Sequence, residues 1–235
     1  MTLGKNQIFA LAGAVICVLL LYFLPSEKSG PAPDAIDSAA PVNRPHAFSA
    51  NPALNTRLLD AVSRAEGQPS EDNFLQAAEL FNDVFSSETD TVHASLQAQK
   101  AIYFYQKTLE KNPGNINAKA GLGWCTALSS NEPMKGIMML REVVKEFPDH
   151  ERTSYYLGLL SVKSGQFQKA IERFETVKKI NSENINVLLP LGEAYFSVGN
   201  KEKALENLSI LKNQTKDKEL STQASILIER INSAR

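Results

Sequence analysis

The chain has 235 residues, a formal net charge of -1 and a hydrophobic fraction of 43%, values typical of a globular protein with one medium-sized domain. The near balance of basic and acidic residues gives no indication that the chain as a whole binds nucleic acid or a strongly acidic partner. The two cysteines, Cys17 and Cys125, lie far apart and in no recognised motif, so the sequence predicts neither a disulfide nor a metal site.

An uncharged apolar segment, IFALAGAVICVLLLYFL, occupies residues 8–24. As a helix it would extend over about 26 Å, which is at the short end of a bilayer span. The main alternative is a cleaved signal peptide, whose apolar core is usually about 7–15 residues long and is followed by a small-x-small cleavage site. Because no clean site of this kind follows, we expect residues 1–24 to form a retained transmembrane anchor, with a signal sequence or a soluble hydrophobic helix as alternatives.

The charges on either side of this segment favour one orientation. Lys5 precedes it, whereas Glu27, Lys28, Asp34 and Asp37 follow it. Positively charged residues tend to remain in the cytoplasm, so the N-terminus is expected inside and most of the chain outside. In a bacterium this describes a single-pass protein of the inner membrane whose C-terminal domain lies in the periplasm.

Residues 25–50 are rich in proline, alanine and serine and have no apolar period. Such a segment has little surface to bury and favours extended backbone, so we expect a disordered linker between the anchor and the folded part.

From residue 51 onward, apolar residues recur at steps of three and four, which predicts helices throughout. Residues 51–115 are assigned to irregular N-terminal helices and a first repeat. Within them, Ser70 followed by Glu71 and Asp72 is typical of a helix N-cap with an acidic first turn.

A helix-turn-helix unit then recurs about every 34 residues. A small residue opens the second helix of each unit, and a large side chain follows four positions later; a Leu-Gly pair repeats in the first helix. Small residues allow two helices to approach closely, and large ones fill the space between units. The aligned residues are Ala101, Gly136, Ala170 and Ala204; Tyr105, Leu140, Phe174 and Leu208; and Gly123, Gly158 and Gly192.

This pattern resembles the tetratricopeptide repeat (TPR), most clearly in YYLGLLSVKSGQFQKAIERFETVKKI and PLGEAYFSVGNKEKALENLSIL. The resemblance implies an all-α, right-handed TPR-like helical solenoid, with repeats at 116–150, 151–184 and 185–218. Pro190 conflicts with a regular first helix in the last repeat, because proline lacks an amide hydrogen and kinks a helix interior.

The last segment, residues 219–235, is expected to form a capping helix that closes the array. Its apolar stripe comprises Leu220, Ala224, Ile226, Leu227 and Ile231.

The resemblance also implies a site, because in this family the first helix of each pair lines a concave groove that holds a partner segment. The polar positions with which some members clamp a C-terminal carboxylate are absent, since Tyr155 and Leu189 stand where polar groups would be needed. The candidate groove residues are Asn117, Trp124, Arg152, Tyr155, Leu159, Asn186, Leu189, Glu193 and Phe196.

The sequence contains no metalloprotease, nucleophile-elbow, phosphate-loop or dinucleotide-binding motif. We therefore expect that the protein is not an enzyme and has no cofactor, small-molecule substrate or nucleic-acid partner. We also expect a bacterial source, in line with the inner-membrane layout described above. The preferred function is a membrane-anchored, periplasm-facing scaffold that binds a protein or peptide partner in its groove. The alternative is an assembly or chaperone factor for exported proteins, similar in layout to factors of cytochrome c maturation or of the Sec translocon. An enzyme or carrier whose site has no sequence signature is a third hypothesis.

Overall fold

The structure, a computed structural model, describes residues 52–88, 90–129 and 131–234. In these residues there are ten α-helices, one 3-10 helix and no strand. The expected anchor (1–24) and linker (25–50) lie outside the described residues, and no helix within the described ranges is long and apolar enough to cross a bilayer. The helices are α2 (Pro52–Gly67), α3 (Glu71–Ser87), α4 (Thr91–Lys111), α5 (Ile116–Ser129), α6 (Pro133–Glu146), α7 (Glu151–Lys163), α8 (Phe167–Ile180), η1 (Ile185–Val187), α9 (Leu188–Ser197), α10 (Lys201–Gln214) and α11 (Lys218–Ser233).

Short polar side chains fix the start of several helices. The hydroxyl of Ser70 accepts a hydrogen bond from the amide of Asn73 at 3.2 Å, which confirms the predicted N-cap of α3. The carboxylate of Asp90 accepts from the amides of Val92 and His93, each at 2.9 Å, at the start of α4. These bonds satisfy amides that have no partner within the first turn of a helix.

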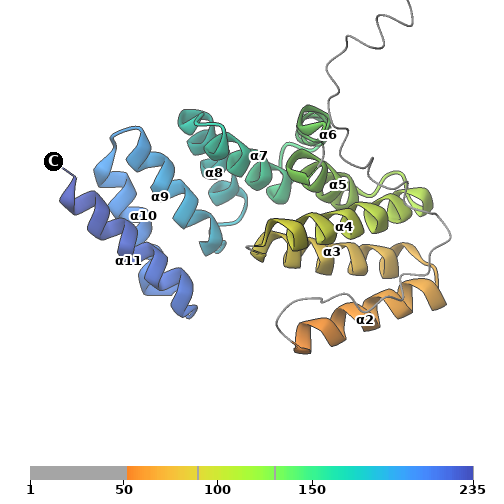
Figure 1. Ribbon diagram of the computed structural model, residues 1–235. Coiled ribbons are helices and arrows are strands. Elements are labelled where there is room, and N and C mark those ends of the chain that lie inside the picture. Colours follow the sequence, from red (N-terminus) through yellow and green to blue (C-terminus); the bar gives the residue numbers. More distant parts are fainter. Residues whose placement is uncertain (1–51, 89, 130, 235) are drawn as a thin grey trace, which may run out of the picture. The chain divides into compact units, whose positions relative to one another are not determined.

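Helices that follow each other in the chain pack as pairs (Figure 1). The pairs are α3 with α4, α5 with α6, α7 with α8 and α9 with α10. The first helices of neighbouring pairs also touch, so α5 contacts α3 and α7, and α9 contacts α7. At the two ends, α2 packs on α3, and α11 packs on α10 and α9. The described chain is therefore a TPR-like array of helix pairs, as the sequence pattern predicts.

In three of these pairs, the two helices approach each other closely at the aligned glycines. A β-carbon at Gly158 would lie 2.4 Å from Cε1 of Phe174, so only glycine allows the two helices to pack at this distance. The same relation recurs in each unit. The small residues therefore allow the predicted close approach of two helices, but each large side chain packs on the glycine of its own unit, where the prediction placed it between units. The three pairs are Gly123–Leu140, Gly158–Phe174 and Gly192–Leu208.

The structure removes the conflict at Pro190. The first helix of the last repeat begins with the 3-10 turn Ile185–Val187, and the α-helix starts only at Leu188. Pro190 is thus in the first turn of α9, where its missing amide hydrogen would have had no helical partner. The helix needs no kink.

The first pair differs from the other three in length. In the other three pairs, the second helix begins three residues before the aligned small residue. In the first pair, α4 begins at Thr91, which is ten residues before Ala101. Asp90 caps this earlier start, and no proline or glycine interrupts the sequence between it and Ala101. This extra length explains why the repeat pattern is hard to align in residues 51–115.

The buried apolar residues form two clusters. The first lies among α2 to α7 and includes the stacked rings of Phe81 and Phe104, whose centroids are 5.7 Å apart. The second lies among α8 to α11, and Ile231 is its last buried residue in the sequence. Tyr155 and Leu159 of α7 pack against both clusters, so α7 joins the two cores.

The C-terminal helix α11 covers the second core as expected of a cap. Ala224 and Ile231 are buried, and Leu220 and Leu227 are partly buried against the cluster. The prediction was wrong for Ile226, which is 61% exposed because it lies on the opposite side of the helix from Ala224.

Candidate binding surfaces

The nine candidate groove residues lie on four elements of the array. Asn117 and Trp124 are on α5, Arg152, Tyr155 and Leu159 on α7, Asn186 on η1, and Leu189, Glu193 and Phe196 on α9. We call this set the first-helix face. Its members differ widely in exposure and in the partners they already have.

Trp124 is a core residue in this structure. Its side chain is 7% exposed, and its ring stacks on that of Tyr156 with centroids 4.6 Å apart and an interplanar angle of 9°. The hydroxyl of Tyr156 accepts a hydrogen bond from Nδ2 of Asn82 at 3.0 Å, which ties α7 to α3. Trp124 therefore holds first helices together and offers little surface to a partner.

Arg152 is also engaged within the chain. Its guanidinium forms an ion pair with Glu79 of α3, and both side chains are partly buried. Burial raises the pKa of Glu79, and the hydrogen bond and charge of Arg152 oppose that shift. A partner carboxylate can reach Arg152 only by competing with Glu79.

Tyr155 and Leu159 are half-buried on α7, where they join the two cores. The ring of Tyr155 lies 6.0 Å from that of Phe174, centroid to centroid, and burial raises the pKa of its hydroxyl. Parts of both side chains remain accessible, so they can contribute apolar contacts without leaving the core.

The most open part of the first-helix face is on η1 and α9. Asn186 and Glu193 are exposed, and Leu189 and Phe196 are half-buried. The guanidinium of Arg230 on α11 lies 5.9 Å from the centroid of the Phe196 ring, which is within the range of a cation–π contact. Exposed polar groups thus flank apolar ones here.

The sequence analysis did not predict a set of side-chain hydrogen bonds at the junctions between helix pairs. Glu151, the first residue of α7, accepts hydrogen bonds from Nδ2 of Asn181 at 3.1 Å and of Asn184 at 2.5 Å. Glu71, the first residue of α3, accepts in the same way from Asn112 at 2.8 Å and Asn115 at 2.6 Å. The signal was present as Asn-x-x-Asn in the loop after the second helix, paired with a glutamate that opens the first helix.

His150 occupies the corresponding place in the junction between the α5–α6 and α7–α8 pairs. Its Nδ1 is 2.6 Å from the hydroxyl of Thr153, and its Nε2 is 3.1 Å from Oδ1 of Asn117. Burial, and then the charge of Arg152, lower the pKa of His150. Asn117 of the first-helix face is therefore exposed but already has a hydrogen-bonding partner.

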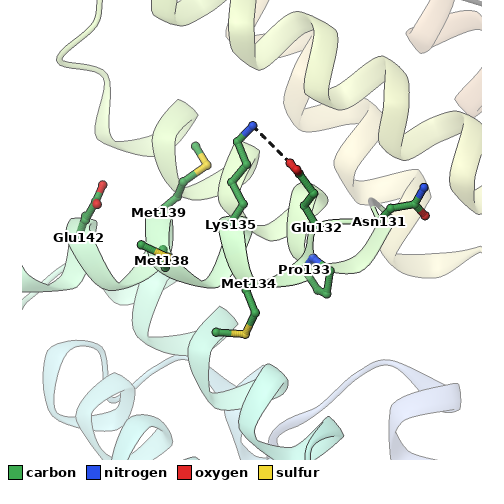
Figure 2. A pocket seen from close by; sticks show the side chains of 8 residues that line it. All are labelled: Asn131, Glu132, Pro133, Met134, Lys135, Met138, Met139 and Glu142. Carbon is green, nitrogen blue, oxygen red and sulfur yellow. Dashed lines mark ion pairs between the residues drawn. The ribbon is translucent and has the colours of Figure 1, made fainter. Parts of the chain in front are cut away.

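A further surface that the sequence did not suggest lies on α6 (Figure 2). Met134 and Met138 are 57% and 56% exposed, and with Met139 they line a hollow of about 620 Å³ beside the Lys135–Glu132 ion pair. We call the three methionines the methionine surface. Methionine is flexible and polarisable and is common at protein-binding surfaces.

Cys125 has the environment of a structural cysteine. It is buried, burial raises the pKa of its thiol, and its Sγ is 3.3 Å from Oδ1 of Asn82. Among the side chains that the structure describes, no group of three or more His, Cys, Asp or Glu could hold a metal ion.

Comparison with known proteins finds similarity only in structure. No protein-family model and no curated protein matches the sequence. Solved structures of MamA are similar: one from Desulfovibrio magneticus RS-1 has a TM-score of 0.48 and 17% identity, covering 78% of this chain and 89% of its own. A second MamA crystal structure has a TM-score of 0.47 and 17% identity, covering 75% of this chain and 90% of its own. Values this low transfer no function, so a functional assignment depends on the residues described above.

Proposed function

We propose that the chain is a membrane-anchored scaffold, facing the periplasm, that holds a segment of a protein partner on its first-helix face. The observation that carries this proposal is the composition of that face on η1 and α9. Leu189 and Phe196 keep part of their apolar surface accessible, and they alternate along η1 and α9 with the exposed polar side chains of Asn186 and Glu193. Apolar anchors flanked by polar groups are the usual composition of a protein-binding site.

The proposed site extends from α9 onto α7. Tyr155 and Leu159 add apolar contacts there, and Glu193 favours a partner that carries a basic or hydrogen-bond-donating group. Trp124 and Arg152 support the site indirectly, because they fix α7 against α5 and α3. Asn117 lies beyond them, at the start of α5.

The proposed anchor and orientation are supported by the uncharged segment 8–24, the charges around it and the proline-rich linker 25–50. An alkaline phosphatase domain fused after the C-terminus is expected to be active only if that end is exported. An inactive fusion, in a strain that exports the same enzyme from a signal peptide, would contradict this orientation.

The binding site is tested by photo-crosslinking in native membranes. A photoreactive residue at Glu193, which is exposed on α9, is compared with one at Lys179, which is exposed on α8. We expect one discrete adduct from Glu193 and none from Lys179.

The other outcomes are equally informative. Many unrelated adducts from Glu193 would indicate a chaperone that binds exported chains generally, instead of a scaffold with one dedicated partner. The same adducts from both positions, or none from either, would contradict the first-helix face as the binding site.

A further inference from the structure

A groove between α6 and α8 lies outside the first-helix face and has a chemistry of its own. Its volume is about 880 Å³, and its walls come from these two second helices and from the C-terminal ends of α5 and α7. This size falls within the range of functional binding pockets in proteins. Met134 lines both this groove and the hollow of the methionine surface, so the two depressions adjoin along α6.

The floor of the groove is apolar. Leu128, Ile137 and Leu160 are partly buried there, Leu157 is buried, and Met134 is exposed at the edge. The floor therefore offers leucine- and isoleucine-sized side chains a place to pack.

The rim of the groove is basic. Arg141, Lys163, Lys169 and Arg173 line it together with a single acidic side chain, Glu172, which leaves an excess of three positive charges. The chain as a whole carries a net charge of -1, so this excess is a local property. None of the four cations forms an ion pair with a described residue; Lys169 donates only to Oε1 of Gln166, at 2.7 Å.

We propose that this groove is a second docking site, whose occupant is an acidic amphipathic segment of another protein. Apolar side chains of the segment pack on the floor, and its carboxylates pair with Arg141 and Arg173 on the two sides of the groove. Arginine suits this role because its planar guanidinium binds a carboxylate through two parallel hydrogen bonds. An anionic lipid headgroup would satisfy the cations but leave the hollow apolar floor unfilled, which is why a protein segment is the better match.

The test uses the full chain in nanodiscs of neutral lipid, with empty nanodiscs as the blank. The probe is a fluorescent synthetic peptide with leucines at helical spacing on one face and glutamates on the other. Two matched peptides carry lysine in place of glutamate, or serine in place of leucine. We expect binding of the first peptide only, and we expect it to weaken as salt is raised.

Variants then assign the binding to the groove. The double variant Arg141→Glu and Arg173→Glu is expected to lower affinity for the glutamate peptide by roughly a hundredfold and to acquire affinity for the lysine peptide. Met134→Ser removes only an exposed apolar group and should weaken binding by about tenfold at unchanged charge. Lys212→Glu makes the same kind of charge change at an exposed site on α10 and should bind like the parent.

Three outcomes would overturn the proposal. The glutamate and lysine peptides could bind the parent equally, or the arginine variants could bind the glutamate peptide like the parent. In the third, no peptide binds but vesicles containing phosphatidylglycerol bind in a way that depends on Arg141 and Arg173, which would make the groove a lipid site.

Discussion

At the scale of single residues, Gly136 is the described glycine whose β-carbon would lie closest to the backbone of another helix. The aligned residues of α8 and α10 are alanines, Ala170 and Ala204, and both are fully buried. At Gly136, however, a β-carbon would lie 2.3 Å from the backbone nitrogen of Ala127 and 2.4 Å from the carbonyl oxygen of Gly123. The α5–α6 pair is therefore packed more tightly than its counterparts, against backbone that has no rotamer to change.

Gly136→Ala is expected to destabilise the protein by about 2 kcal/mol. The helix propensity of alanine contributes roughly 1 kcal/mol in favour, but overpacking against backbone costs about 3 kcal/mol. Chemical denaturation followed by circular dichroism measures the difference. Gly67→Ala is the control, because a β-carbon there meets nothing within 4 Å and should leave stability unchanged or slightly higher. Equal stability of the two variants would contradict this account.

The sequence predicted which residue types occupy the repeat positions. It did not predict which of these side chains are accessible to a partner. The recurrence of small and large residues in register, as at Gly158 and Phe174, follows from spacing alone, but the contact of these two residues within one unit does not. The burial of Trp124 and the pairing of Arg152 depend on Tyr156 and Glu79, which lie in other units of the array. No pattern within one repeat specifies such contacts between units.

At the scale of elements, the junctions between helix pairs are held by polar side chains. Glu151 of α7 accepts hydrogen bonds from Asn181 and Asn184, which belong to the loop after α8. This contact ties the loop that leads from α8 into η1 and α9 to the start of α7. The sequence predicted the helices well and their starts less well, because a start depends on which side chain caps it, as at Asp90 and in the 3-10 turn before α9.

Glu151→Ala is expected to lower the free energy of unfolding by about 2 kcal/mol, since two hydrogen bonds to a charged acceptor are lost. Glu183→Ala in the same loop is the matched control, because its side chain is exposed and its effect should stay within about 0.5 kcal/mol. A double-mutant cycle with Asn184→Ala measures the coupling directly. Additive effects of the two substitutions would show that this contact does not stabilise the junction.

His150 makes one junction sensitive to pH. Its pKa is lowered in the folded state from the ordinary value of 6.5, so the unfolded chain binds the proton more tightly. The contribution of His150 to stability is therefore complete above about pH 6.5 and is lost as the pH falls below that value. Arg152 opposes protonation and Glu151 favours it, and desolvation is the largest cause of the shift.

His150→Asn is expected to remove this part of the pH dependence. Asparagine stands at the corresponding position in Asn115 and Asn184, where its side chain caps the following helix; His150 makes no such cap. Urea denaturation at pH values on both sides of 6.5 provides the comparison. A variant whose stability changes with pH as steeply as that of the parent would contradict the assignment to His150.

At the scale of the whole described region, stability is divided between two cores that meet at α7. Arrays of repeats gain stability from contacts between neighbours, so damage to one core need not spread to the other. Tyr155 and Leu159 are the residues through which such damage would spread, because they pack against both.

Leu208→Ala and Leu140→Ala remove aligned, fully buried side chains from the second and the first core, and each should cost about 2–5 kcal/mol. Hydrogen exchange is expected to increase mainly in α9 to α11 for Leu208→Ala and mainly in α3 to α6 for Leu140→Ala. Equal loss of protection throughout the array in both variants would show that the two cores unfold as one.

The order in which the two cores lie along the chain has a consequence for biosynthesis. All residues of the first core precede the end of α7, so that half can fold as soon as α7 has emerged from the ribosome. The second core lacks Ile231 until α11 has followed. In the interval, α8 to α10 have no cap, and their apolar surface is open to chaperones and to other unfinished chains. A nascent chain stalled before α11 would therefore present a folded first half and an aggregation-prone second half.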